Sequence, residues 1–271
     1  MSHEQQTNFA SGRGVLEAQM EGGANPGTLG AQLFATSDSL RENPSLLRAL
    51  TDAGRDSAAR EGLAAAVFGP HVDGPTLTVI KNSVGGHWNR PDALAAELGE
   101  LGLAAYVAEA KDVGGVDVLC QQLVDVMGVV SRNRDLRVDL SDLGVGSPDD
   151  RAELACKIFK NHLDAPARAL VRRAVFTTQY GELIQKLRKY AETAAWLTDK
   201  KLVIGASAAP LSEKQQTRLT YLASKRWNTP VLMTWDVDPD LVGGFRLDMG
   251  EQAVDTSVRS DLQEARLALT S

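Results

Sequence analysis

Histidine and cysteine are the residue types that most often bind metal ions or form a nucleophile and its base, so their spacing is the first test for chemistry. The six such residues are His3, His71, His87, His162, Cys120 and Cys156. None of them forms an HExxH, HxH or CxxC arrangement. Cys156 and His162 lie six residues apart without a further histidine or cysteine nearby. We therefore expect no metal ligands and no catalytic histidine or cysteine.

Two of the histidines stand in the same local setting. His71 and His162 each precede an aspartate by two residues and a proline by four. Aspartate and proline favour turns, because the aspartate side chain bonds the local backbone and the proline ring fixes φ. We interpret both histidines as parts of structural turns.

Motifs for phosphate binding or serine catalysis are also missing. The chain has no GxxxxGK[ST] loop. Gly144 and Gly146 have GxG spacing but no third glycine, and they lie between two helical patterns, so we interpret them as part of an interhelical loop. Ser207 lacks the second glycine of a GxSxG turn. We expect no cofactor-binding residues and no cofactor.

Carboxylate pairs occur at Asp149-Asp150 and at Asp236 and Asp238. Both pairs flank predicted turns, where acidic side chains are usually solvated turn formers. A basic cluster of Lys186, Arg188 and Lys189 lies on a helix whose other face is apolar, which predicts a solvated face. An acidic protein partner is the alternative for that cluster. The sequence thus predicts no catalytic residues.

Composition narrows the class of protein. The 271 residues include 29 basic and 35 acidic side chains, for a net charge of −6, and aromatic residues make up 5%. Sequence-independent nucleic-acid binding needs a basic surface, so we expect no nucleic-acid partner. No apolar run is long enough to cross a membrane, so we expect no direct membrane insertion. The two separated cysteines are typical of a reducing compartment.

The N-terminal part of the chain is predicted to be helical. Residues 1–28 are polar and glycine-rich, so we expect a flexible arm with a helix only around 15–20. Residues 29–111 show helical spacing of leucine and alanine, and we expect a first helical module there. Pro44 and Pro91 are placed where helices would begin.

A second helical module, over 119–199, repeats the first. Asn43, Leu46 and Leu50 return 90 residues later, and Arg60, Phe68 and His71 return 91 residues later. We expect Phe68 to superpose on Phe159 and Tyr106 on Trp196, with all four aromatic side chains in the core. Residues 36–108 carry a net charge of −3 and residues 126–198 one of +3. The repeat predicts one fold with two different surfaces.

The periodicity changes near residue 200 and predicts a small α/β domain over 200–271. We expect strands at 202–208, 231–235, 243–248 and 253–255, a helix from Ser212 to about residue 227, and a last helix from Ser257. Gly243-Gly244 lies inside a strand pattern, which indicates a bulge or close backbone packing. The predicted fold class is mainly α with a small α/β part: tandem helical bundles followed by this domain.

Three segments of the C-terminal domain carry a resemblance to a known family. They are Ala206–Ser212, reading ASAAPLS, Val237–Phe245, reading VDPDLVGGF, and Val254–Val258, reading VDTSV. They resemble the delta subunit of F-type ATP synthases, which is related to the mitochondrial oligomycin-sensitivity-conferring protein. The resemblance extends from about Val124 to the C-terminus. The additional first module is similar to the long actinobacterial form of the family.

This resemblance implies a non-catalytic part of the peripheral stalk, which couples rotation to ATP synthesis. It implies two partners: the N-terminal helix of an ATP synthase alpha subunit, held by a helical bundle, and a b subunit, held by the C-terminal domain. It also implies a peripheral location at the cytoplasmic face of the cell membrane. Helices near 126–140 and 183–197 are candidates to line the groove for the alpha helix. A free-standing helical adaptor and an enzyme with an unrecognised active site remain as alternatives.

Overall fold

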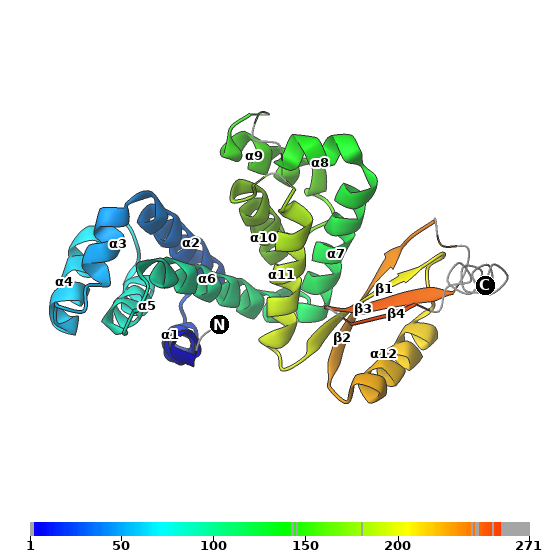
Figure 1. Ribbon diagram of the computed structural model, residues 1–271, viewed down its shortest axis with the longest axis horizontal. Coiled ribbons are helices and arrows are strands. Elements are labelled where there is room, and N and C mark those ends of the chain that lie inside the picture. The colour runs from blue at the N-terminus through cyan, green and yellow to red at the C-terminus, as the bar shows by residue number, and fades with distance from the viewer. Residues whose placement is uncertain are drawn as a thin grey trace, which may run out of the picture. The chain divides into compact units, whose positions relative to one another are not determined.

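The computed structural model shows a mainly helical protein with one small sheet (Figure 1). It describes residues 3–141, 144, 146–179, 181–239, 241, 244–250 and 252–255. The chain divides into two compact units, Met1–Glu109 and Ala110–Ser271. The first unit is helical. The second unit contains a helical bundle and the sheet, which correspond to the second predicted module and the predicted α/β domain.

The first unit is built from helices whose starts are set by capping residues and prolines. The helices are α1 (His3–Glu21), α2 (Pro26–Glu42), α3 (Pro44–Leu50), α4 (Ser57–Phe68), α5 (Gly74–Gly85) and α6 (Pro91–Val113). The side chains of Asn25, Asp56 and Asp73 accept hydrogen bonds from backbone N–H groups in the first turns of α2, α4 and α5. Pro44 and Pro91 begin α3 and α6, as the sequence predicts.

The N-terminal residues differ from the flexible arm that the sequence predicts. α1 packs against α5, and its side chains Phe9 and Leu16 are buried. The side-chain amide of Asn8 also donates a hydrogen bond to the carbonyl of His87 over 2.8 Å. Phe9 and Leu16 lie seven residues apart and therefore share one face of the helix. The average polarity of residues 1–28, on which the prediction of a flexible arm rested, does not reveal such a face.

The second unit begins with a bundle that repeats the first unit's helices. We call α7–α11 the second bundle; its helices are α7 (Val116–Arg132), α8 (Arg134–Ser141), α9 (Pro148–Phe159), α10 (Ala165–Phe176) and α11 (Leu183–Trp196). The bounds of α7 follow those of α2 at an offset of 90, and the bounds of α9 and α10 follow those of α4 and α5 at 91. These are the offsets of the sequence repeat.

Individual contacts repeat as well. The backbone N–H of Asp73 donates to the side-chain oxygen of Gln32 over 3.1 Å, and Asp164 donates to Gln122 in the same way over 3.1 Å. Phe68 and Phe159 are both 5% exposed, so this aromatic pair occupies the core in both units. These shared contacts indicate that the two sets of helices arose by duplication. The positions of the helices and some of their contacts have been retained, and not only their amino-acid composition.

The second aromatic pair is a correction to the sequence analysis. Tyr106 is 8% exposed, but Trp196 is 55% exposed and is not a core residue. A Cβ atom on Gly30 would lie 2.6 Å from the ring of Tyr106, so the glycine leaves the space that the ring occupies. Cys120 stands at the position equivalent to Gly30 and is itself buried. The position that leaves room for the ring in the first unit thus carries a side chain in the second bundle.

The sheet follows the bundle in chain order. It contains β1 (Lys201–Ser207), β2 (Val231–Val237), β3 (Phe245–Met249) and β4 (Gln252–Asp255), with α12 (Glu213–Trp227) between the first two. The strand order is β2-β1-β3-β4, with β1 and β2 parallel and the other pairs antiparallel. We call these elements the sheet domain. The helix predicted from Ser257 and residue Gly243 lie outside the described residues.

The helix between the parallel strands covers one face of the sheet. Ser212 and Gln215 form a capping box at its start, as the sequence predicts for Ser212. The small core of the sheet domain contains Val203, Ala223, Val231 and Leu247. Gly244 precedes β3 with a φ of 76° instead of lying within a strand, so its role is to provide a backbone conformation that side chains disfavour.

Candidate interaction surfaces

Both cysteines belong to the second bundle, but only Cys120 lies in its interior. Cys120 is buried and its Sγ donates to the carbonyl oxygen of Ala191 over 3.5 Å, and Cys156 is partly buried. Burial raises the pKa of both thiols, that of Cys120 to about 12, so both stay protonated and weakly nucleophilic at neutral pH. Within the described part of the chain, no three His, Cys, Asp or Glu side chains are placed to hold a metal ion.

The repeated histidines and one acidic pair have local structural roles. The backbone N–H groups of His71 and His162 donate to Phe68 and Phe159 over 2.8 and 3.0 Å, which confirms the two predicted turns. Asp150 forms a capping box with Ser147 at the start of α9. The Ser147 hydrogen bonds lower the pKa of the Asp150 carboxyl, because they stabilise its charged form.

The basic cluster on α11 is only partly solvated, which corrects the sequence analysis. The two Nη atoms of Arg188 donate to the two carboxylate oxygens of Asp248 over 3.2 and 3.1 Å. Lys186 donates through Nζ to the carbonyl of Thr177. Of the three, only Lys189 is exposed, and the other two are half-buried. Sequence spacing identified the basic face but could not show that a strand of the sheet domain contacts it.

The helices near 126–140 and 183–197, which are candidates to line a groove, lie next to each other in the second bundle. α7 and α11 pack directly against each other, and Leu123, Leu187 and Ala191 are buried. Their apolar faces therefore form the interior of the second bundle. Any surface that these two helices offer to a partner would consist of their outward-facing residues, among them the exposed Val118, Val129 and Trp196.

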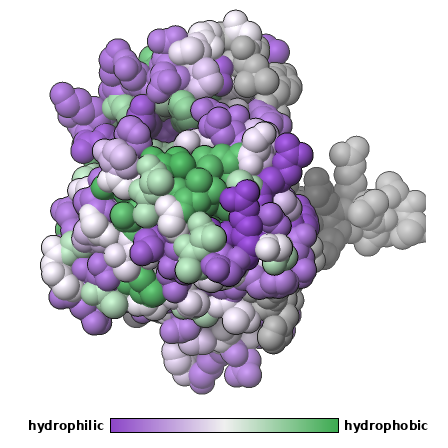
Figure 2. All heavy atoms as spheres, turned by 90° about the vertical axis from the view of Figure 1, so that its left-hand side faces the viewer, coloured by the Kyte–Doolittle hydropathy of each residue, from purple (hydrophilic) through white to green (hydrophobic). Residues whose placement is uncertain are grey.

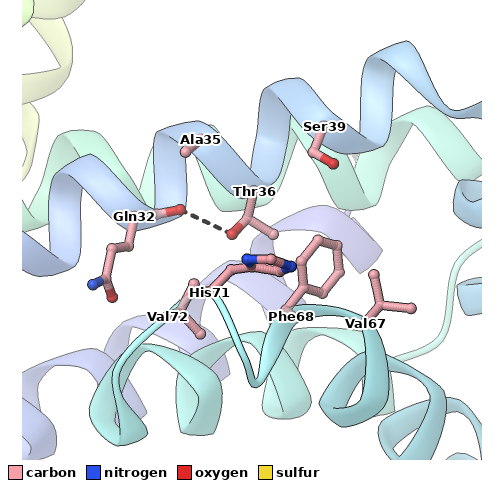
Figure 3. A pocket seen from close by; sticks show the side chains of 8 residues that line it. All are labelled: Gln32, Ala35, Thr36, Ser39, Val67, Phe68, His71 and Val72. Carbon is pink, nitrogen blue, oxygen red and sulfur yellow. Dashed lines mark hydrogen bonds between the residues drawn. The ribbon is translucent and has the colours of Figure 1, made fainter.

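A cavity of about 330 Å³ lies on the first unit between α2 and the end of α4 (Figure 3). The residues lining it are Gln32, Ala35, Thr36, Ser39, Val67, Phe68, His71 and Val72. The Thr36 hydroxyl donates to the carbonyl of Gln32 over 2.8 Å, so this polar group is already paired. Figure 3 shows the rings of His71 and Phe68 side by side in the cavity. The lining is suited to an apolar side chain and holds no nucleophile with a paired base.

Apolar side chains also gather on one side of the first unit. Figure 2 faces the side on which α4 lies in Figure 1, and it shows hydrophobic residues at the centre with hydrophilic ones around them. In this unit, however, every large hydrophobic side chain that the structure describes is at least partly covered. The patch is therefore formed by partly covered side chains.

The exposed large hydrophobic side chains belong to the second unit, as far as the structure describes the chain. They are Val113, Val118, Val129, Leu154, Ile158, Trp196, Tyr221, Leu222 and Val237. Leu154 and Ile158 lie one turn apart on α9, and Tyr221 and Leu222 are neighbours on α12. Lys225 places its ammonium group 4.7 Å from the centre of the Tyr221 ring. Clusters of exposed apolar side chains are typical of contact surfaces.

One buried ionisable residue escaped the sequence analysis. Glu97 on α6 is 4% exposed, and burial raises the pKa of its carboxyl to about 7. A charged residue between the core positions Leu94, Leu98 and Leu101 was a visible signal, since it interrupts an apolar helical face. The Ser83 hydroxyl and the neighbouring Glu100 are the polar groups that act on the pKa of this carboxyl.

Comparisons with known proteins give a consistent family. Residues 104–269 match the family model described as "ATP synthase delta (OSCP) subunit", which is more than half of the chain. The curated "ATP synthase subunit delta" of Rhodococcus opacus is 31% identical over 243 residues, covering 89% of this chain and 86% of that protein. The protein of the same name from Kineococcus radiotolerans is 28% identical over 264 residues, covering 97% and 95%.

The matches include both units. The family model begins inside α6 and continues through the second bundle and the sheet domain. The Kineococcus alignment covers nearly the whole chain, so the first unit is shared with full-length actinobacterial relatives. Among the described residues, no single helix is both long and apolar enough to span a membrane. The chain belongs to the ATP synthase delta (OSCP) subunit family.

Proposed function

We propose that this protein acts as a non-catalytic stator subunit, with no active site of its own, that links the catalytic head of the F-type ATP synthase to a b subunit. Membership of the family supports the general part of this proposal, that the chain is a structural, peripheral-stalk subunit of the ATP synthase complex. A stator must resist the torque of the rotor and needs extended contacts instead of catalytic groups. The paired or capped polar groups and the protonated thiols described above support this role.

We propose two partners for the second unit. A helical bundle holds the N-terminal helix of an alpha subunit, and the sheet domain holds a b subunit. The exposed apolar residues of this unit support the assignment, because helix-on-helix recognition buries such side chains. The protein lies at the cytoplasmic face of the cell membrane, attached through the complex, with no direct membrane insertion and no nucleic-acid partner.

Hydrogen exchange of the full chain with synthetic partner helices tests this division. A peptide of the alpha subunit's N-terminal helix should protect amides within 116–196, and a peptide of the b subunit's C-terminal helix should protect amides within 201–255. Peptides of the same composition in scrambled order are the control. Protection confined to the first unit, or equal protection by the scrambled peptides, would contradict the proposal.

A coupling assay separates the stator from the free-standing adaptor. Membranes of a strain lacking this protein should hydrolyse ATP but lose proton-driven ATP synthesis, and the purified chain should restore synthesis. The pure chain should show no ATPase activity. An adaptor outside the complex would leave synthesis unchanged and would not copurify with alpha and b subunits.

A further inference from the structure

A carboxyl group lies buried in the first unit, at the place where α1, α5 and α6 meet. Glu97 on α6 is 4% exposed, and neither oxygen of its carboxyl has a hydrogen-bond partner of regular geometry among the described residues. The hydroxyl of Ser83 on α5 acts on the carboxyl, but it makes no regular hydrogen bond with it. A buried carboxylate without such partners is poorly stabilised, so this environment favours the protonated form.

The N-terminal helix α1 covers this carboxyl. A Cβ atom on Gly12 would lie 3.3 Å from Glu97 Oε1, so the backbone of α1 passes directly over the carboxyl. Phe9 and Leu16, about one turn to either side of Gly12, are buried and turn this face of α1 inward. Movement of α1 away from α6 would therefore give water access to Glu97.

α1 is attached in a way that permits such a movement. The side chains of Asn8 and Ser11 donate to the carbonyl of His87 and to Asn82 Oδ1 over 2.8 and 3.4 Å, and both hydrogen bonds are exposed to solvent. After α1 the chain turns at Gly23, whose φ is 94°, before α2 begins. Glycine leaves the backbone free at this turn, so α1 can pivot there.

The second bundle shows that the helical framework does not require a carboxyl at this place. Leu187 corresponds to Glu97 at the offset of 90, and Ala174 corresponds to Ser83 at the offset of 91. Both are 0% exposed, so the equivalent place in the second bundle is apolar core. A glutamate in the first unit is therefore unfavourable for packing, which indicates a role other than packing.

The charged groups around Glu97 add to the effect of burial. Glu100, one turn along α6, carries a like charge and raises the pKa of Glu97 further. In the middle of α1, Arg13 is paired with Glu17 of the same helix over 2.7 Å. Lys81 is the one charged residue of α5, and the group that acts on Glu97 from this helix is the Ser83 hydroxyl. The ionised form of Glu97 thus depends on access to water.

We propose that α1 is a pH-sensitive latch: it closes over α5 and α6 while Glu97 is protonated, and ionisation of Glu97 favours an open position of α1, reached by a pivot at Gly23. The closed form keeps a proton that the open form, with the carboxyl in water, releases. Opening therefore becomes more favourable as pH rises from 4.5, the ordinary pKa of glutamate, to about 7, and it levels off above this value. The latch belongs to the first unit alone and does not depend on the stator assignment.

Hydrogen exchange of the full chain tests the latch. The rates are divided by the intrinsic rate of each amide at each pH, which leaves the protection due to structure. From pH 6 to pH 8.5, we expect protection of the α1 amides to fall about tenfold, because the opening equilibrium follows the two pKa values. Protection in α4 should stay constant. Constant protection in α1, or a parallel fall in α1 and α4, would overturn the proposal.

Glu97→Gln should abolish the pH dependence of α1, since glutamine keeps the shape of the side chain and does not ionise. Glu42→Gln removes an exposed carboxyl of the same unit and is the matched control, so this variant should behave like the wild type. A fall in α1 protection that persists in Glu97→Gln would assign the effect to another group and overturn the proposal.

The coupling must also act in the opposite direction, because linkage is reciprocal. Phe9→Ala removes a buried anchor of α1, so the pKa of Glu97 should fall from about 7 toward 4.5. NMR titration of ¹³C-labelled glutamate carboxyls measures this value, with the Glu97 signal identified by its loss in Glu97→Gln. Val67→Ala on α4 is the control and should leave the pKa unchanged. If Phe9→Ala removes protection in α4, the milder Phe9→Leu takes its place. An unchanged pKa of Glu97 in a variant that keeps α4 protected would overturn the proposal.

Discussion

At the scale of single residues, burial of a carboxyl group makes stability depend on pH. Glu97 has a pKa raised from 4.5 to about 7, chiefly by burial, with the neighbouring Glu100 adding to the rise and the Ser83 hydroxyl opposing it. The folded protein therefore keeps a proton that the unfolded chain releases between these two values. Stability should fall as pH rises through this interval, because the charged carboxylate is poorly solvated.

The substitution Glu97→Gln should remove this loss of stability at higher pH, because glutamine has no proton to release in this range. The shift corresponds to a free energy on the order of 3 kcal/mol between the two pKa values. We expect urea unfolding of the wild type to show decreasing stability from pH 4.5 to 7. The variant should lack most of this decrease and be the more stable form at pH 8. Glu42→Gln, which removes an exposed carboxyl of the same unit, is the control. A variant less stable than the wild type at every pH would contradict this account.

Gly244 gives a second prediction at this scale. Its φ of 76° lies in the left-handed region, where a β-branched side chain is strained. Gly244→Val should destabilise the second unit by about 1–3 kcal/mol, measured by thermal unfolding. Gly244→Asn should lose much less, because asparagine tolerates this conformation better. Equal effects of the two substitutions would point to a steric contact instead of backbone strain.

At the scale of elements, α2 and α6 approach closely through two glycines. A Cβ atom on Gly30 would meet the ring of Tyr106 at 2.6 Å, and one on Gly102 would meet the ring of Phe34 at 2.8 Å. The two rings are stacked with centres 5.6 Å apart. Each glycine thus accommodates an aromatic side chain of the opposite helix, and the pairs reinforce each other.

Gly30→Ala and Gly102→Ala should therefore destabilise the first unit, although alanine is the better helix former. We expect losses of about 1–3 kcal/mol each, the usual cost of overpacking, in denaturant unfolding. Gly14→Ala in α1 is the control, because a Cβ atom there has open space and should be neutral or stabilising. Stabilisation by Gly30→Ala would show that the helices can move apart without cost.

The same elements show what the sequence could and could not predict. Capping residues and prolines act locally, so Pro44, Pro91 and Ser212 identified helix starts correctly. The prediction that Trp196 is buried was wrong, because the repeat aligns it with Tyr106, whose space is left by Gly30 on another helix of the first unit. The pairing of Arg188 with Asp248 likewise joins distant elements, and no local pattern indicates it. The sequence therefore predicted features that depend on neighbouring residues, such as helix starts, but not contacts between residues that are distant in the chain.

At the scale of the whole molecule, the repeat in the sequence and the compact units divide the chain differently. The sequence separates a polar arm and three domains, with boundaries near residues 28, 111–119 and 200. The structure has one boundary, between Glu109 and Ala110, and joins the second bundle to the sheet domain. The interface explains the difference, because the sheet would expose Leu202 and Leu232 without the bundle. Periodicity recognises repeated modules but not the surfaces that they share.

A chain truncated after Lys200 should therefore lose more than its contact with a b subunit. Removal of the sheet also uncovers α7 and α11, so the second bundle should unfold at a lower temperature while the first unit keeps its own transition. A loss of about 2 kcal/mol would lower the midpoint by roughly 8–16 °C for a bundle of this size. Calorimetry of the full and truncated chains measures both transitions. Gln121→Ala in the full chain should lower the same transition by less. If the truncated bundle unfolds at the temperature of the full chain, the sheet domain is an independent attachment, and truncation becomes a clean test of b binding alone.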